Sequence, residues 1–221
     1  QKEQVVKTLD RKRGVCADYS ALFKALCDEV SVEAVVIEGN SRSYYNPFRG
    51  NHNNAHAWNA VKIDGKWQLL DATWGAGYTD PPVKKFTRRV SDGYFFTPPY
   101  MFAQSHLPDE PDWQLMGKKR SKKDFADQPM VDLGQTRYKI VRCAPEARKS
   151  SDGKKHRIWL EFETVPKEIM VATSNGKKVE FTRSDSDKKV TLNINSSASS
   201  VIVYAGESLK KRMHVIAKYK L

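Results

Sequence analysis

Apolar residues near the start of the chain recur at spacings of three and four, as they do along the buried face of a helix. They are Tyr19, Leu22, Phe23, Leu26 and Val30. The spacing predicts a helix that begins close to Cys16 and buries this stripe. Cys27 falls on the apolar side of the same helix, so we expect it to pack in the core. A shorter helix is expected upstream, over residues 3–9.

A β-hairpin is predicted from two β-prone runs, residues 57–63 and 66–72, which flank Asp64-Gly65. An Asp-Gly pair is a strong signal for a two-residue hairpin turn, and such a turn fixes the register of the two strands. In that register His56 and Asp71 are diagonal neighbours on one face. Diagonal neighbours lie roughly 7–8 Å apart at the backbone, so the carboxylate could hold the imidazole.

The pattern changes after the basic run at residues 118–123 to short strands separated by turns. Seven strands are predicted, over residues 137–143, 156–162, 168–172, 178–182, 190–195, 200–205 and 213–219. Asn175-Gly176 predicts a hairpin turn, and residues 184–187 predict a longer one. Seven short strands in this length are typical of a small β-sandwich of immunoglobulin-like size. We therefore predict two domains, residues 1–130 and 131–221.

Candidate chemistry is concentrated in the first predicted domain. Cys16 is expected in the first helical turn, where unpaired backbone N–H groups and the helix dipole stabilise a thiolate. A thiol nucleophile needs a base, and the base needs an orienting carboxylate; His56 and Asp71 are the candidates. The same N–H groups would form an oxyanion hole. Residues 31–55 could fold in several ways, so the sequence does not bring Cys16 beside His56.

Several short motifs resemble one known family. They are Gly14-Val15-Cys16, Leu22-Phe23-Lys24-Ala25-Leu26-Cys27, His56-Ala57-Trp58 and Asp71-Ala72-Thr73-Trp74-Gly75. Together they resemble the transglutaminase-like core. The resemblance continues through residues 94–102, His106-Leu107-Pro108 and Trp113-Gln114-Leu115, which indicates the kyphoscoliosis-peptidase and hillarin branch. It implies an α+β, papain-like fold, in which a helix bearing the Cys packs on an antiparallel sheet, and a Cys16-His56-Asp71 triad.

The resemblance implies a thiol-dependent acyl-transfer enzyme that attacks a peptide or protein amide through a thioester. Classical transglutaminases have Gly-Gln-Cys-Trp around the nucleophile, whereas this chain has Gly14-Val15-Cys16-Ala17. Hydrolysis by a peptidase or amidase is therefore slightly favoured over crosslinking. The alternative is a catalytically inactive scaffold that binds a structural or cytoskeletal protein or an acidic surface polymer. Candidate substrate-binding residues are Tyr44, Tyr45, Trp58 and Trp74, whose other role would be packing.

No metal and no cofactor are expected. His52 and His56 are four residues apart, but Asn46, Pro47 and Gly50 indicate a loop rather than the helix that a zinc-protease motif requires. His106 is expected to be a loop or packing residue, or to line the cleft. Asp185 and Asp187 are expected in a turn and do not match a calcium loop.

Charge is shared unevenly between the two predicted domains. Residues 132–221 carry 19 basic and 10 acidic side chains, a net charge of +9 out of the +12 of the whole chain. Such a module could bind an acidic polymer or an acidic protein, or could simply have a solvated lysine-rich surface. Nucleic acid is not favoured, because the β half lacks the aromatic and basic signature of a known nucleic-acid reader.

The compartment cannot be read from the sequence. Three cysteines in two presumed domains do not make a disulfide framework, which suits the cytoplasm or a bacterial extracytoplasmic enzyme with few cysteines. The chain begins at Gln1, so we expect an upstream region that is absent from this sequence. No apolar run is long enough for a membrane span.

Overall fold

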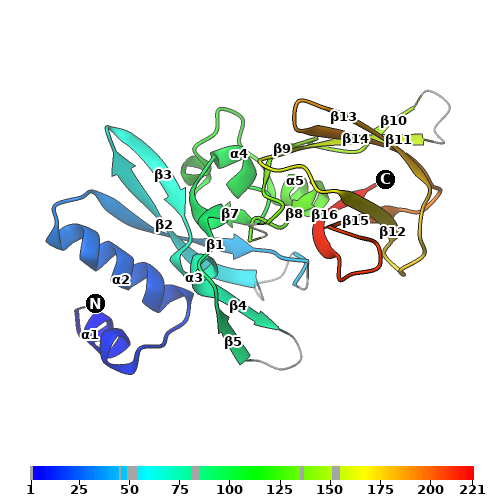
Figure 1. Ribbon diagram of the computed structural model, residues 1–221. Coiled ribbons are helices and arrows are strands. Elements are labelled where there is room, and N and C mark those ends of the chain that lie inside the picture. Colours follow the sequence, from blue (N-terminus) through cyan, green and yellow to red (C-terminus); the bar gives the residue numbers. More distant parts are fainter. Residues whose placement is uncertain (1, 45, 49–53, 81–84, 135–136, 151–154) are drawn as a thin grey trace. The chain divides into compact units, whose positions relative to one another are not determined.

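The computed structural model describes residues 2–44, 46–48, 54–80, 85–134, 137–150 and 155–221. They form two compact units (Figure 1). The first comprises Gln1–Arg42 and Asn46–Phe125, and the second comprises Ser43–Tyr45 and Ala126–Leu221. The chain thus passes between units at Phe125, a few residues before the predicted boundary.

The first unit combines helices with an antiparallel sheet in the order β6-β3-β2-β1-β7. Its elements are α1 Lys2–Arg11, α2 Cys16–Glu29, β1 Ala34–Ser41, β2 Ala55–Ile63, β3 Lys66–Leu70, α3 Ala72–Ala76, β4 Gly77–Asp80, β5 Lys85–Arg88, η2 Asp92–Tyr94, β6 Phe95–Thr97, α4 Pro99–Phe102, β7 His106–Pro108, η3 Pro111–Gln114 and, crossing into the second unit, α5 Lys122–Asp127. The mixed α+β content predicted for this region is confirmed.

Helix α2 begins at Cys16 and packs on the sheet. Cys27 lies in an apolar cluster with Ala34, Val61 and Leu70, so its predicted core position is confirmed. The predicted stripe was wrong toward the end of the helix. Leu26 is 56% exposed and Val30, just beyond the helix, is 69% exposed. The buried residues of the helix are Ser20 and Cys27, and Phe23 packs against the apolar cluster of Cys27.

The β2–β3 hairpin has the predicted register, with Ile63 opposite Lys66. Asp64 and Gly65 both have positive φ, 50° and 75°, as a two-residue type I′ turn requires. The second strand is shorter than predicted, because β3 ends at Leu70. Asp71 instead caps α3: its side chain accepts hydrogen bonds from the backbone of the first helical turn.

Strand β1 lies between β2 and β7, and Gly39 stands opposite both His56 and Pro108. A Cβ at Gly39 would lie 2.3 Å from the Leu107 carbonyl oxygen and 2.8 Å from Cη2 of Trp58. The lack of a side chain therefore leaves space above the middle strand. Side chains from β2 and β7 can meet there.

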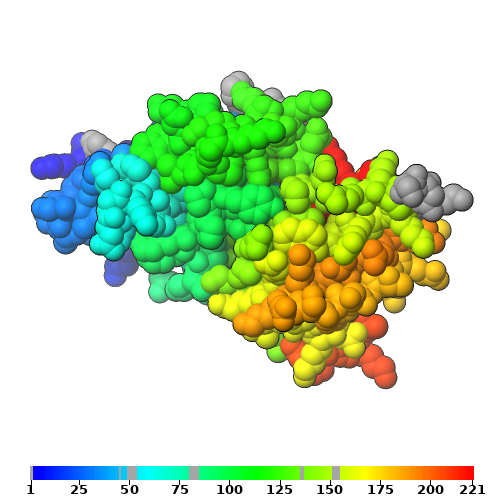
Figure 2. All heavy atoms as spheres, turned by 90° about the horizontal axis from the view of Figure 1, so that it is seen from above, coloured from blue at the N-terminus to red at the C-terminus, as the bar shows by residue number. Residues whose placement is uncertain are grey.

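The second unit contains two antiparallel sheets, ordered β10-β11-β14-β13, with β9 also on β11, and β12-β15-β16-β8. Their strands are β8 Met130–Val131, β9 Ile140–Cys143, β10 Arg148–Lys149, β11 Lys155–Phe162, β12 Glu168–Thr173, β13 Phe181–Ser186, β14 Lys189–Asn195, β15 Ser200–Gly206 and β16 His214–Lys220. Alternate residues of the long strands are buried, as in β11, where Ile158, Leu160 and Phe162 form part of the core. Figure 2 shows the atoms of this unit in yellow-green to red.

Two turn predictions in this unit had different outcomes. Gly176 has a φ of 85°, and the chain reverses there so that Ala172 pairs with Lys178. The strand predicted at residues 178–182 was wrong in its start, since β13 begins at Phe181. The turn predicted at residues 184–187 was also wrong, because β13 continues to Ser186 and the reversal falls at Asp187 and Lys188.

In the part of the chain that the structure describes, no helix combines the length and apolar character needed to cross a membrane.

We expect Gly39→Ala to destabilise the first unit by about 1–3 kcal/mol, because the added methyl group must displace a backbone carbonyl and a buried indole. Gly117→Ala is the matched control, since a Cβ there meets no atom within 4 Å. Urea unfolding of both variants measures the difference. Equal stability of the two variants would contradict the proposed close approach.

Candidate active site

The start of α2 is fixed by Asp18. Its carboxylate accepts a 2.9 Å hydrogen bond from the Val15 backbone N–H, which is half of a capping box. Gln4 of α1 donates to the other carboxylate oxygen at 2.8 Å. Gly14 makes this fold-back feasible, since a Cβ there would lie 2.6 Å from Cβ of Asp18. These contacts set the position of Cys16, the first residue of the helix.

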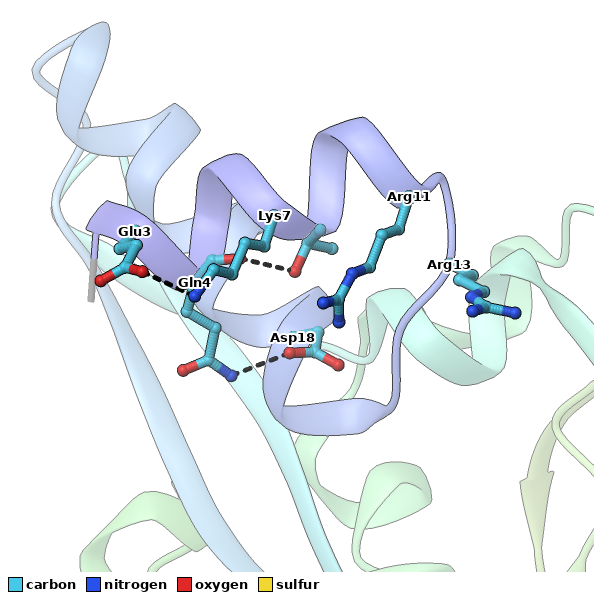
Figure 3. A pocket seen from close by; sticks show the side chains of 7 residues that line it. Glu3, Gln4, Lys7, Arg11, Arg13 and Asp18 are labelled. Atoms are coloured by element: carbon cyan, nitrogen blue, oxygen red, sulfur yellow. Dashed lines mark hydrogen bonds and ion pairs between the residues drawn. The ribbon is translucent and has the colours of Figure 1, made fainter.

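A hollow of about 420 Å³ lies beside this helix start, between α1 and α2 (Figure 3). Glu3, Gln4, Lys7, Thr8, Arg11, Arg13 and Asp18 line it. Several of its polar groups are already paired, because Lys7 bonds Glu3 and Gln4 bonds Asp18. Its contacts connect α1 with the helix start, and none of the three residues of the candidate triad lines it.

Cys16 is partly buried, whereas Cys27 and Cys143 are buried, and all three are free thiols. The hydrogen bond with His56 is the largest influence on Cys16 and lowers its pKa; burial opposes this, and backbone groups of Ala57 and Ala17 lower it further. The structure therefore brings together the two residues that the sequence could not connect. The thiol lies where a thiolate is stabilised.

His56 of β2 and Asp71 at the end of β3 are in direct contact, with Nε2 of His56 2.7 Å from Oδ2 of Asp71. This confirms the proximity that the hairpin register predicts. Because Nε2 faces the carboxylate, Nδ1 is the nitrogen left for Cys16. The order of contacts is thiol, imidazole and carboxylate, as nucleophilic catalysis by a thiol requires.

A fourth residue joins this chain of contacts. Nε2 of His106, in β7, is 3.0 Å from the same Oδ2 of Asp71. His106 is 1% exposed, and its ring stacks on Phe102 with centroids 4.0 Å apart. Its Nδ1 is 2.9 Å from Oγ of Ser105. Asp71 therefore lies between two imidazoles.

The charges of the site follow from these contacts. Burial by itself lowers the pKa of His56, but hydrogen bonds to Asp71 and Cys16 raise it to about 9. Burial also opposes ionisation of Asp71, yet the bonds from His106 and His56 hold the pKa of that carboxyl well below its usual range. For His106, burial prevails and lowers the pKa. Near neutral pH the site thus favours an imidazolium at His56, a carboxylate at Asp71 and a neutral His106.

His56, Asp71 and His106 are also the residue types that bind metal ions, and their ligand atoms lie within 4.8 Å of one another. Both imidazole nitrogens approach one carboxylate oxygen at hydrogen-bond distances, 2.7 and 3.0 Å. Metal ligation needs the lone pairs of those nitrogens, whereas here each nitrogen donates a proton. The geometry fits a hydrogen-bond network better than a metal centre.

The predicted substrate-binding residues fall in different places. Trp58 is 1% exposed and packs in a cluster with Ile37, Leu69 and Phe102, which leaves little of its surface for a substrate; its substrate contact stays a prediction. Trp58 lies against the His106 ring, with centroids 5.0 Å apart. Trp74 is partly buried beside His56 and His106, with centroids 5.1 and 4.9 Å away. Its substrate contact stays a prediction.

The loop tyrosines remain untested. Tyr44 belongs to the short segment grouped with the second unit, and Tyr45 lies outside the described residues, as does His52.

His106 is the residue whose place in the site sequence reasoning missed. It reaches Asp71 because β7 pairs with β1, with His106 opposite Ser41, two positions from the pairing of His56 with Gly39. The signal available in the sequence was an ionisable residue at the start of the branch motif His106-Leu107-Pro108, whose other two residues are apolar. No local pattern indicates which strand that motif joins.

Comparison with known proteins agrees with the motif resemblance. Residues 1–72 match the transglutaminase-like superfamily. Mouse kyphoscoliosis peptidase is 37% identical over 114 residues, covering 50% of this chain and 17% of that protein. Hillarin of Drosophila melanogaster is 31% identical over 127 residues, covering 51% of this chain and 15% of that protein. The Lim and transglutaminase domain protein ltd-1 of Caenorhabditis elegans is 31% identical over 125 residues, covering 51% and 17%.

These alignments span about half of the chain and less than a fifth of each relative. The superfamily match, residues 1–72, contains Cys16, His56 and Asp71. The first part of this chain is therefore similar to the transglutaminase-like superfamily, and the chain is similar to kyphoscoliosis peptidase and hillarin within it.

Proposed function

We propose that the first unit is a papain-like, thiol-dependent acyl-transfer enzyme that acts on a peptide or protein amide. Cys16 is the nucleophile, His56 the base and acid, and Asp71 the residue that orients His56. Hydrolysis is favoured slightly over crosslinking. The observation that carries this proposal is the continuous contact from a partly exposed thiol through His56 to a buried carboxylate.

The chemistry of each proposed step follows from the geometry. The Cys16 thiolate attacks the acyl carbon, and the tetrahedral intermediate collapses as the amine leaves with a proton from His56. A thioester and a neutral imidazole remain. Water, activated by His56, then attacks the thioester and releases a carboxylic acid and the thiol; a lysine amine in place of water would give a crosslink. Backbone N–H groups at the start of α2 are suited to hold the oxyanion.

The competing proposal is a catalytically inactive scaffold for a structural or cytoskeletal protein. The triad arrangement does not by itself prove turnover, since one fold carries several functions. Thiol reactivity discriminates between the two proposals without knowledge of the substrate, because an inactive site need not keep a low thiol pKa.

We expect Cys16 to react with iodoacetamide faster than Cys27 or Cys143 at pH 7, because its pKa is lowered whereas that of buried Cys27 is raised. Its reactivity should fall as acid protonates the thiolate, and should change again near pH 9, where His56 loses its proton. Mass spectrometry of each cysteine across pH gives all three rates in one sample.

His56→Ala is the matched variant for this measurement. It should return the Cys16 profile toward that of an ordinary thiol, because the hydrogen bond and the imidazolium charge are lost. If wild-type Cys16 already reacts as an ordinary thiol, or if the variant keeps the wild-type profile, the ion pair is refuted and the scaffold proposal is favoured.

Turnover should be abolished by Cys16→Ala and by His56→Ala. Asp71→Asn should slow it strongly while preserving the cap of α3, because Oδ1 remains an acceptor but the amide cannot accept the His56 proton. The assay is mass spectrometry of glutamine peptides and casein digests, with and without a primary amine, which separates hydrolysis from transfer. Full activity of Cys16→Ala would remove the triad assignment.

For the second unit we propose an immunoglobulin-like β-sandwich that binds an acidic polymer or protein. Support comes from its net charge of +9 over residues 132–221 and from one sheet face. Arg148 lies opposite Arg157 across β10 and β11, and Lys155 is two residues from Arg157 on the same face. All three side chains are exposed. An acidic ligand would relieve the repulsion between the paired arginines.

The double variant Arg148→Ser/Arg157→Ser should elute from immobilised heparin at lower salt than wild type. Lys210→Ser is the control, because it removes an exposed charge from a turn outside this sheet. If the double variant lowers the eluting salt concentration only twice as much as Lys210→Ser, each charge counts equally and a defined binding face is contradicted. Binding that does not depend on salt would exclude an electrostatic contact.

A further inference from the structure

The Asp71 carboxylate has four hydrogen-bond donors. Oδ1 accepts from the backbone N–H groups of Thr73 at 2.8 Å and Trp74 at 2.9 Å. Oδ2 accepts from His56 at 2.7 Å and from His106 at 3.0 Å. A carboxylate offers about four lone-pair sites, so all of them are filled. Because Asp71 is 1% exposed, a lost donor could not easily be replaced by bulk solvent.

The contacts of His106 indicate which of its ring nitrogens carries the proton. Its Nε2 faces a carboxylate and must therefore be the protonated nitrogen of the neutral ring. Its Nδ1 is then an acceptor and lies 2.9 Å from Oγ of Ser105, a hydroxyl that is also 3.4 Å from the Phe102 carbonyl oxygen. The ring itself is enclosed by the aromatic residues Trp58, Trp74, Tyr94 and Phe102. Burial in this apolar setting disfavours the imidazolium, which is why its pKa is lowered.

We propose that His106 is a positioning residue of the candidate site: as a neutral N–H donor it fills the last acceptor site of Asp71 and limits how tightly that carboxylate holds the His56 proton. Its effect on catalysis rests on the proposed function of the triad. Its effect on His56 does not, because the hydrogen bonds exist without a substrate.

The proposed role matters when His56 gives its proton to the leaving amine. Asp71 is then a buried anion beside a neutral imidazole. Backbone N–H groups of Thr73 and Trp74, together with His106, still stabilise its charge. Without His106, the carboxylate would be the stronger base and would retain the His56 proton more firmly. The loss should therefore slow proton transfer to the leaving group.

The test compares His106→Phe with His106→Gln. Phenylalanine keeps an aromatic ring against Phe102 and removes the donor, whereas the glutamine amide can place an N–H close to the position of Nε2. NMR of ¹³C-labelled histidines, with His56 assigned through His56→Ala, measures the His56 pKa. Besides His106, which is coupled to His56 by charge, the ionisable groups that act on His56 are Asp71 and Cys16, and both remain in each variant.

We expect His106→Phe to raise the proton affinity of His56 about tenfold, and His106→Gln to return it toward the wild-type value. Thermal unfolding checks that each variant is folded. No change in the His56 pKa in folded His106→Phe would overturn the proposal. An equal shift in both variants would also overturn it, because the residue would then act through packing alone.

A measurement on the wild-type protein covers the case in which a variant fails to fold. Long-range ¹H–¹⁵N spectra should show His106 as the neutral tautomer with the proton on Nε2 between pH 6 and 8. A proton on Nδ1 only, or a doubly protonated ring, would overturn the proposal. If His106 behaves as expected but Cys16 is inert toward iodoacetamide, the proposed function fails while the positioning role stands.

Discussion

A buried carboxylate is the constraint on which the candidate site depends. Asp71 is 1% exposed, yet it must stay ionised to raise the proton affinity of His56. A buried carboxylate without hydrogen-bond partners would take up a proton and become neutral. Two backbone N–H groups at the start of α3 and two imidazole N–H groups remove that penalty together. The short helix is thus part of the site, because its first turn supplies half of the donors.

The sheet explains how the donors meet at one point. His56 and His106 come from strands on either side of β1, and the ring centroids are 5.5 Å apart. Such an approach over a middle strand needs a position without a side chain, which Gly39 provides. Trp58 and Phe102 then pack against the His106 ring and restrict its orientation. Packing and hydrogen bonding therefore fix the same imidazole, which is how a site becomes preorganised.

Local sequence signals predicted the parts of the site that lie close together along the chain. Asp64-Gly65 sets the hairpin register, and this register alone places His56 near Asp71. The helix start at Cys16 was predicted from apolar spacing near it. The same spacing failed at Leu26 and Val30, which are exposed, whereas Ser20 and Cys27 are buried. The reversal at Asp187 and Lys188 was predicted a few residues too early, because neither residue is the glycine that usually indicates positive φ.

The contacts of Cys16 with His56 and of Asp71 with His106 depend on pairing between distant segments. The sequence of residues 31–55 does not predict how the chain runs from the helix to the hairpin. Strand β7 follows the hairpin in the chain and joins the sheet by pairing with β1. Non-local pairing is decided by the whole core rather than by a local pattern. The family resemblance implied the Cys16-His56-Asp71 triad without any knowledge of strand pairing, but it assigned no role to His106.

The energetics of the network bear on the choice between enzyme and scaffold. Replacing buried ion pairs by well-packed apolar residues is often neutral or stabilising, so a protein that only binds a partner gains little from two imidazoles on one carboxylate. The thiols add a second argument. Cys27 and Cys143 are buried, whereas Cys16, which adjoins His56, is partly exposed. A nucleophile must be accessible to its substrate, so we expect its thiol to be partly exposed even though the charged groups that activate it are buried.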